Sequence, residues 1–98
     1  MTEDYFKKNN IKLPSINEAD NQDNPPVVAH FQKETWHWYI IGGDKLSNND
    51  YYLYALVDGD FVELGMVTLK QILSVGAELD TNWKQEGLYD IKKRINQI

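Results

Sequence analysis

The chain has 98 residues and 42% hydrophobic content, which suits one packed domain, so residues 1–98 are predicted to form a single domain. It has no cysteine, which excludes disulfides and thiolate zinc sites as the basis of the fold. The net charge of −5 disfavours direct nucleic-acid binding, because phosphate contacts need a basic surface. The same charge favours a basic protein partner, or it serves only to keep the domain soluble.

The N-terminal part of the chain is polar. No apolar run approaches the roughly 18 residues that a membrane span needs, and the layout of a signal peptide is missing, so a cytoplasmic location is expected. Residues 1–25 are predicted to hold a short helix followed by a polar loop. Thr2 is the predicted cap of that helix, and Ser15 with Glu18 matches a capping box that starts one more helical turn.

Two successive β-hairpins are predicted next. In residues 27–32 and 35–42, apolar and polar side chains alternate with a period of two, which is typical of half-buried strands. Residues 51–67 form the second hairpin, because Asp58 and Gly59 are a strong signal for a two-residue turn of type I′. The predicted core face carries Trp36, Trp38, Leu53, Val57, Val62 and Leu64.

The remaining elements complete an α+β fold. Thr68 and Gln71 form a second capping box, and Gly76 ends the helix that this box starts. Residues 77–83 are predicted as a short edge strand or an extended segment, and residues 84–98 as a C-terminal helix. We therefore predict a four- to five-stranded antiparallel sheet of two successive hairpins, with helices packed on one face and the opposite face partly open.

The two histidines of the chain are candidate metal ligands. If residues whose numbers add to 67 are paired, His30 lies opposite His37 on the non-core face, with Cβ atoms ~5 Å apart. Glu63 is predicted on the same face, and two histidines with a carboxylate suit a structural zinc ion, with water or Asp44 as the fourth ligand. The alternative is a surface pair of histidines without a ligand, because the pairing depends on the turn between the strands.

Three tyrosines, Tyr39, Tyr52 and Tyr54, are predicted to share the non-core face. Exposed tyrosines favour a protein interface, unless the terminal segments of the chain cover them. The chain has no cysteine nucleophile, glycine-rich phosphate loop or HExxH helix, so a non-enzymatic function is expected. A small metal-dependent hydrolase, with a metal-activated water at the histidines, is the catalytic alternative.

Two motifs within residues 26–83 carry a family resemblance. A W-x-W-Y strand at residues 36–39 is followed by a hairpin and by an E-L-G segment at residues 63–65 that leads into a helix. In this order the motifs resemble a small domain-of-unknown-function family found on plasmids, conjugative elements and prophages. The chain departs from the family pattern at Gly42, where an acidic residue is expected and Asp44 is only nearby.

The resemblance implies a protein of a mobile element. Small acidic domains carried by phages are also similar to anti-CRISPR proteins, which inhibit effector nucleases by binding them. We expect a non-enzymatic inhibitor in the cytoplasm of a bacterial host that binds a basic Cas9-type nuclease and obstructs nucleic-acid loading. Its predicted partner-binding residues are Tyr39, Tyr52, Tyr54 and Asp44. The alternative is a metal-stabilised accessory protein of conjugation or plasmid maintenance.

Overall fold

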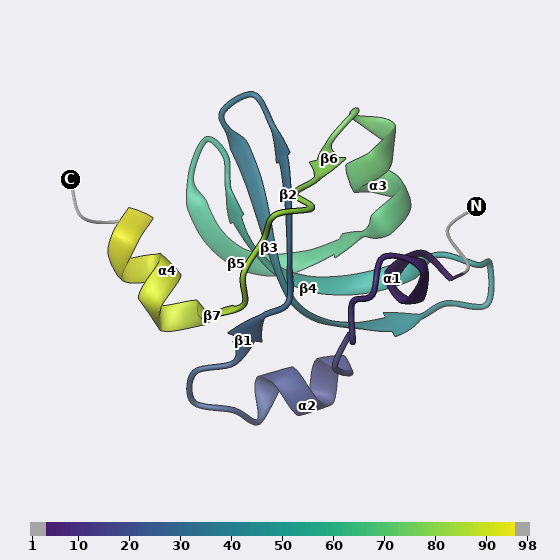
Figure 1. The fold of residues 1–98 in the computed structure, drawn as a ribbon, viewed down its shortest axis with the longest axis horizontal. Helices are drawn as coiled ribbons and strands as arrows, with labels where there is room; N and C mark the ends of the chain where they lie inside the picture. Colours follow the sequence, from purple (N-terminus) through teal and green to yellow (C-terminus); the bar gives the residue numbers. More distant parts are fainter. Residues whose placement is uncertain (1–3, 96–98) are drawn as a thin grey trace.

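A computed structural model describes residues 4–95 and shows an α+β fold (Figure 1). Five antiparallel strands form the main sheet in the order β5-β4-β3-β2-β6, and β1 pairs with β7 in a separate two-stranded sheet. The strands are β1 Pro26–Val27, β2 Ala29–Lys33, β3 Trp36–Lys45, β4 Tyr51–Asp58, β5 Val62–Thr68, β6 Glu78–Leu79 and β7 Glu86–Gly87. The helices are α1 Tyr5–Lys8, α2 Ile16–Asp20, α3 Leu69–Ser74 and α4 Leu88–Ile95. The predicted fold class and antiparallel sheet are confirmed.

Reciprocal side-chain caps start two of the helices, as predicted. The Glu18 amide donates to the Ser15 hydroxyl, and the Ser15 amide donates to the Glu18 carboxylate, each at 3.1 Å. Thr68 and Gln71 make the same pair of contacts at the start of α3. A cap of this kind stabilises a helix by about 1 kcal/mol. Thr2, the other predicted cap, lies outside the described residues.

The first hairpin has a different register from the predicted one. His30 pairs with Tyr39 and Gln32 pairs with His37, so the numbers of paired residues add to 69 rather than 67. The turn consists of residues 34–35, and the first of them adopts a φ of 55°. Because the slip is two residues, the side chains of residues 29–33 and 36–40 keep their predicted faces while their partners change. The predicted direct opposition of His30 and His37 is therefore wrong. Val27, which we predicted on the face of Ala29 and Phe31, packs with Tyr39 instead.

The second hairpin turns through three residues instead of the predicted two. Asp58 pairs with Val62, and the Gly59 amide donates to the Phe61 carbonyl at 3.1 Å. The Trp36 ring lies over Gly59, and a Cβ added there would collide with it. Gly59 is thus required for a close approach, and its φ is not positive. Trp36, which we predicted for the core, remains 38% exposed.

The extra turn residue reverses the face of every β5 side chain. Glu63 pairs with Val57 and lies on the face of Trp38, so its predicted place beside the histidines is wrong. Val62 and Leu64, which we predicted for the core, lie on the histidine face and are 37% and 41% exposed. A change of one turn residue therefore exchanges the core and surface positions of this strand.

Helices pack against both faces of the main sheet. The first face packs against α1 and α3 in a cluster of Phe6, Ala29, Phe31, Trp38, Ile40, Leu53, Ala55, Leu69, Ile72 and Ala77. The second face, which carries the histidines, packs against α2 and α4 in a cluster of Ala19, Val27, Tyr39, Ile41, Leu56, Leu88 and Ile91. The helices thus divide between the two faces, whereas we predicted one covered face. None of the described helices has the length and apolar character that a membrane span requires.

Candidate functional site

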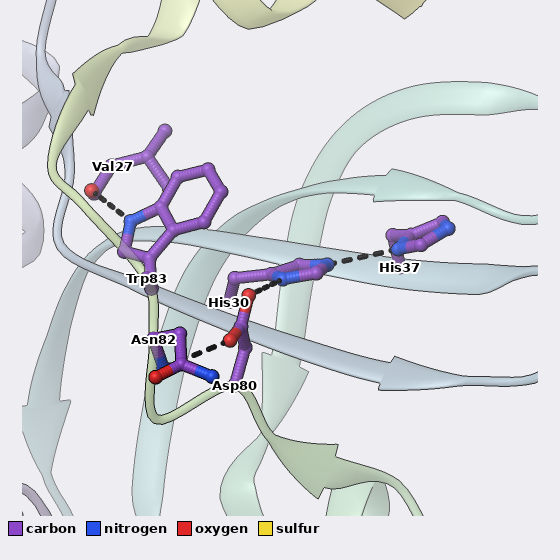
Figure 2. Close-up of polar contacts among 6 residues, drawn as sticks. All are labelled: Val27, His30, His37, Asp80, Asn82 and Trp83. Carbon is purple, nitrogen blue, oxygen red and sulfur yellow. Dashed lines mark hydrogen bonds and ion pairs between the residues drawn. The ribbon is translucent and has the colours of Figure 1, made fainter.

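His30 lies at the centre of a polar network on the second face (Figure 2). It is only 6% exposed, and its Nδ1 lies 3.0 Å from Oδ2 of Asp80. Its Nε2 lies 2.8 Å from Nδ1 of His37. Because a carboxylate only accepts hydrogen bonds, Nδ1 of His30 carries a hydrogen, and a second hydrogen lies between the two rings. We call these three residues the Asp–His–His chain.

The segment that follows β6 holds Asp80 against His30. The Asp80 amide donates to the His30 carbonyl at 2.8 Å, and the Asn82 amide donates to Oδ1 of Asp80 at 3.0 Å. The Trp83 indole donates to the Val27 carbonyl at 2.8 Å, and its ring lies 5.1 Å from that of His30. Figure 2 shows the carboxylate and the indole approaching His30 from this one segment. The segment therefore supplies both a charged partner and an apolar cover.

Aromatic stacking completes the burial of His30. The Tyr39 ring, directly opposite on β3, stacks on it with centroids 4.8 Å apart and an angle of 11° between the planes. His37 pairs with Gln32, so it is the diagonal neighbour of His30. Diagonal neighbours in a sheet can touch when their side chains are long or aromatic. The predicted meeting of the two histidines on one face is thus confirmed, although their predicted pairing was wrong.

Burial and nearby charges set the protonation of the Asp–His–His chain. Partial burial, followed by the charge of His30, lowers the pKa of His37 below its ordinary value of 6.5, and Asp58 opposes this shift. The hydrogen bond from His30 lowers the pKa of Asp80 below its ordinary value of 3.8. Burial, followed by the charge of Asp58, raises the pKa of Tyr39. At neutral pH, His37 is therefore uncharged and Asp80 is ionised.

The predicted zinc ligands do not come together. Glu63 lies on the opposite face from the histidines, and both ring nitrogens of His30 already have partners. Nitrogens on one tetrahedral zinc ion lie about 3.3 Å apart, which is more than the 2.8 Å between the two rings. Within residues 4–95, no group of three or more His, Asp or Glu side chains is arranged to hold a metal ion. The geometry is that of a hydrogen-bonded chain.

The predicted partner-binding residues differ in exposure. Tyr39 is only 6% exposed, and Tyr54 is half-buried beside Asp20. Tyr52 is 42% exposed. Asp44 is exposed at the far end of β3, where it accepts a hydrogen bond at 3.4 Å from the first amide of α2. Of the three tyrosines, Tyr52 is therefore the one that the surface offers to a partner.

An exposed row of apolar side chains lies on the second face, beyond the strands that α2 and α4 cover. We call this row the apolar stripe, and it consists of Tyr52 on β4 with Val62, Leu64 and Met66 on β5. Each of these side chains is between 37% and 42% exposed. Phe61, in the hairpin turn at one end of the row, is 78% exposed. The sheet therefore leaves contiguous apolar surface uncovered along one edge.

Two parts of this site were not predicted from the sequence. The apolar stripe was missed because the predicted two-residue turn at Asp58 assigns each β5 side chain to the opposite face of the sheet. Asp80 was missed because it is far from His30 in the sequence. The available signal was its turn composition, since an aspartate two residues before Asn82 is typical of a side-chain-stabilised turn.

A small pocket opens between α2, α4 and the apolar stripe. It has a volume of about 140 Å³, and Asp20 and Asp23 line it together with Tyr54, Leu64 and Tyr89. Carboxylates beside tyrosine rings suit the side chain of Lys or Arg, through ion pairing and cation–π contact. The apolar stripe therefore borders a negatively charged hollow.

Comparisons of the chain with protein-family models, curated proteins and solved structures return no match. The predicted family resemblance is therefore carried by its two motifs alone. The W-x-W-Y motif begins β3, and the E-L-G motif lies within β5. A Cβ added at Gly65 would meet no atom within 4 Å, so packing inside this chain does not require the glycine of that motif.

Proposed function

We propose that this chain is a non-enzymatic protein-binding module that contacts its partner through the apolar stripe. The observation that carries this proposal is the joint exposure of four large side chains, Tyr52, Val62, Leu64 and Met66, on one face. Helices shield the two hydrophobic clusters of the sheet, whereas these side chains belong to neither cluster. Contiguous exposed apolar surface on a small domain is typical of a protein contact.

The charge of the chain narrows the class of partner. The net charge is −5, and acidic side chains lie at the hairpin end of the apolar stripe and beside its middle. Asp58 and Asp60 lie at the hairpin tip, and Asp20 and Asp23 line the pocket beside Leu64. A basic surface would gain long-range attraction and a faster association rate. We therefore propose a basic protein as the partner.

The family resemblance supports a more specific partner, a Cas9-type nuclease. Such a nuclease holds its guide–target duplex in a positively charged channel. An acidic domain bound to that channel would compete with nucleic acid for the same basic surface, and this inhibition needs no active site. The Asp–His–His chain then has a structural role, because its hydrogen bonds join β2 and β3 to the segment that follows β6.

Pull-down of purified Cas9-type nucleases, paired with a DNA-cleavage assay, tests the proposal. We expect a stoichiometric complex and slower cleavage, with affinity about tenfold lower in the double variant Leu64→Ala/Met66→Ala. Val75→Ala is the matched control, because Val75 is 51% exposed but lies at the end of α3. It should behave like the wild type. No binding to any nuclease orthologue, with undiminished cleavage, would refute the nuclease partner.

A further inference from the structure

β5 forms one edge of the main sheet and, within the described chain, pairs only with β4. Its ladder runs without a bulge along the whole strand. Soluble proteins usually keep edge strands short or block them with lysine, proline or a bulge. The opposite edge follows this rule, because β6 has two residues. β5 has seven residues and no lysine, proline or bulge, and Glu63 is its one charged side chain.

We propose that the partner contributes an extended segment that pairs with β5 and becomes a further strand of the sheet. This inference rests on the proposed function and specifies how the apolar stripe is covered. A strand at this edge would pair with the N–H and C=O groups of β5 that point away from β4. It would also place every second side chain beside Leu64 and Met66.

The first face of β5 determines the chemistry of the partner's other side chains. Glu63 is exposed on this face, and a Cβ at the neighbouring position, Gly65, would have no atom within 4 Å. A long side chain of the added strand can therefore cross Gly65 and bring a cation to Glu63, since diagonal neighbours are within reach. The occupant that fits is an extended segment in which apolar residues alternate with Lys or Arg.

Charge disfavours a second copy of this chain as the occupant. Two molecules with a net charge of −5 repel each other as they approach. Antiparallel pairing of β5 with a second β5 would also place two Glu63 carboxylates on the same face of adjoining strands, where like charges are destabilising. A basic segment would instead be attracted by the net negative charge of this protein and by the Glu63 carboxylate.

A capped peptide of alternating valine and lysine, about nine residues long, is the probe for this inference. Amide hydrogen exchange, followed by NMR on the full chain, reports which β5 amides the peptide protects. We expect protection of every second amide, namely those that point away from β4. A peptide of the same sequence with N-methyl groups on consecutive central residues lacks backbone N–H donors on both of its sides, so it cannot pair with β5 through either side. Its affinity should be at least about tenfold lower.

Two charge reversals supply matched variants at the two edges of the sheet. Glu63→Lys and Glu78→Lys change the net charge equally, and both glutamates are exposed, on β5 and β6 respectively. We expect Glu63→Lys to lower peptide affinity at least about tenfold and Glu78→Lys to change it less than about twofold. Equal effects of the two variants, equal binding of the N-methylated peptide, or the absence of β5 protection would each overturn the inference. Protection of β5 that rises with protein concentration alone would assign the edge to a second copy, and would also overturn it.

The same variants separate this inference from the proposed function. If the peptide protects β5 but no nuclease binds, the nuclease partner is refuted and strand pairing stands. If a nuclease binds the wild type and Glu63→Lys equally and leaves β5 unprotected, strand pairing is refuted and the protein-binding function stands.

Discussion

Nε2 of His30 and Nδ1 of His37 lie 2.8 Å apart, although the two residues are not opposite each other in their hairpin. One hydrogen lies on this line. It belongs to His37 when both rings are neutral, and to His30 when that ring is protonated. In both cases the contact joins the buried His30 ring to the half-buried His37 ring. The other nitrogen of His30, Nδ1, makes the hydrogen bond to Asp80.

The two histidines should contribute unequally to stability. We expect His30→Ala to lower the free energy of unfolding by about 2–3 kcal/mol, because it empties a buried position and leaves Asp80 without its partner. His37→Ala should cost about 1 kcal/mol, because this ring is only half-buried. Urea unfolding of the two variants measures both values. Equal losses would show that the network does not depend on the burial of His30.

The pH dependence of stability should have two separate steps on the acid side. The folded-state pKa of His37 is lowered, so the unfolded chain binds more protons and stability falls as the pH drops below about 6.5. The folded-state pKa of Asp80 is also lowered, so its contribution is present above about 3.8 and is lost as the pH falls below that value. Urea midpoints between pH 8 and pH 3 test both steps. His37→Gln should remove the upper step and keep the lower one, and a profile unchanged in this variant would contradict the assignment.

Metal removal should leave the fold unchanged. Both nitrogens of His30 are in hydrogen bonds, and Glu63 lies on the other face of the sheet. We therefore expect the same melting temperature with and without a chelator, and no rise when zinc is added in small excess. Elemental analysis of the purified protein is the independent readout. Stoichiometric zinc that is lost in His37→Ala would instead support the metal-stabilised alternative.

The close approach of Trp36 to Gly59 should be measurable by a double-mutant cycle. Gly59→Ala should lower stability by about 1 kcal/mol, because the added methyl group displaces the indole ring from the hairpin turn. The same change in a Trp36→Ala background should cost little, since the obstacle is gone. If the two substitutions add without coupling, the ring does not constrain the turn.

The faces of most β2 and β3 side chains were predictable, because a register slip of two residues matches the period of a strand. The alternation of side chains specifies which ones share a face, and the two-residue slip in register left that assignment intact for residues 29–33 and 36–40. His30 and His37 therefore met as expected. The assignment failed at Val27, which packs with Tyr39, and at Gly42, which follows a bulge in β3. In the second hairpin the predicted faces of β5 were not preserved, because the turn has three residues rather than the predicted two. Glu63 and Leu64 consequently exchanged faces.

The partners of the histidines could not be read from local pattern. The contact between His30 and Asp80 joins positions 50 residues apart, and the contact between Val27 and Trp83 joins positions 56 apart. Periodicity describes a strand and its neighbours, whereas these contacts depend on how the chain returns after α3. The capping boxes were predictable for the opposite reason, because all their atoms lie within four successive residues.

The division of the core between the two faces of the sheet has a consequence for how the molecule opens. The buried cluster of the first face contains no residue beyond Ala77, whereas that of the second face depends on Leu88 and Ile91 of α4. Residues 80–95 can therefore detach together while the first cluster remains intact. We expect native-state hydrogen exchange to show this segment as a separate cooperative unit of lower stability, whose opening exposes His30 and Tyr39 before the sheet itself unfolds.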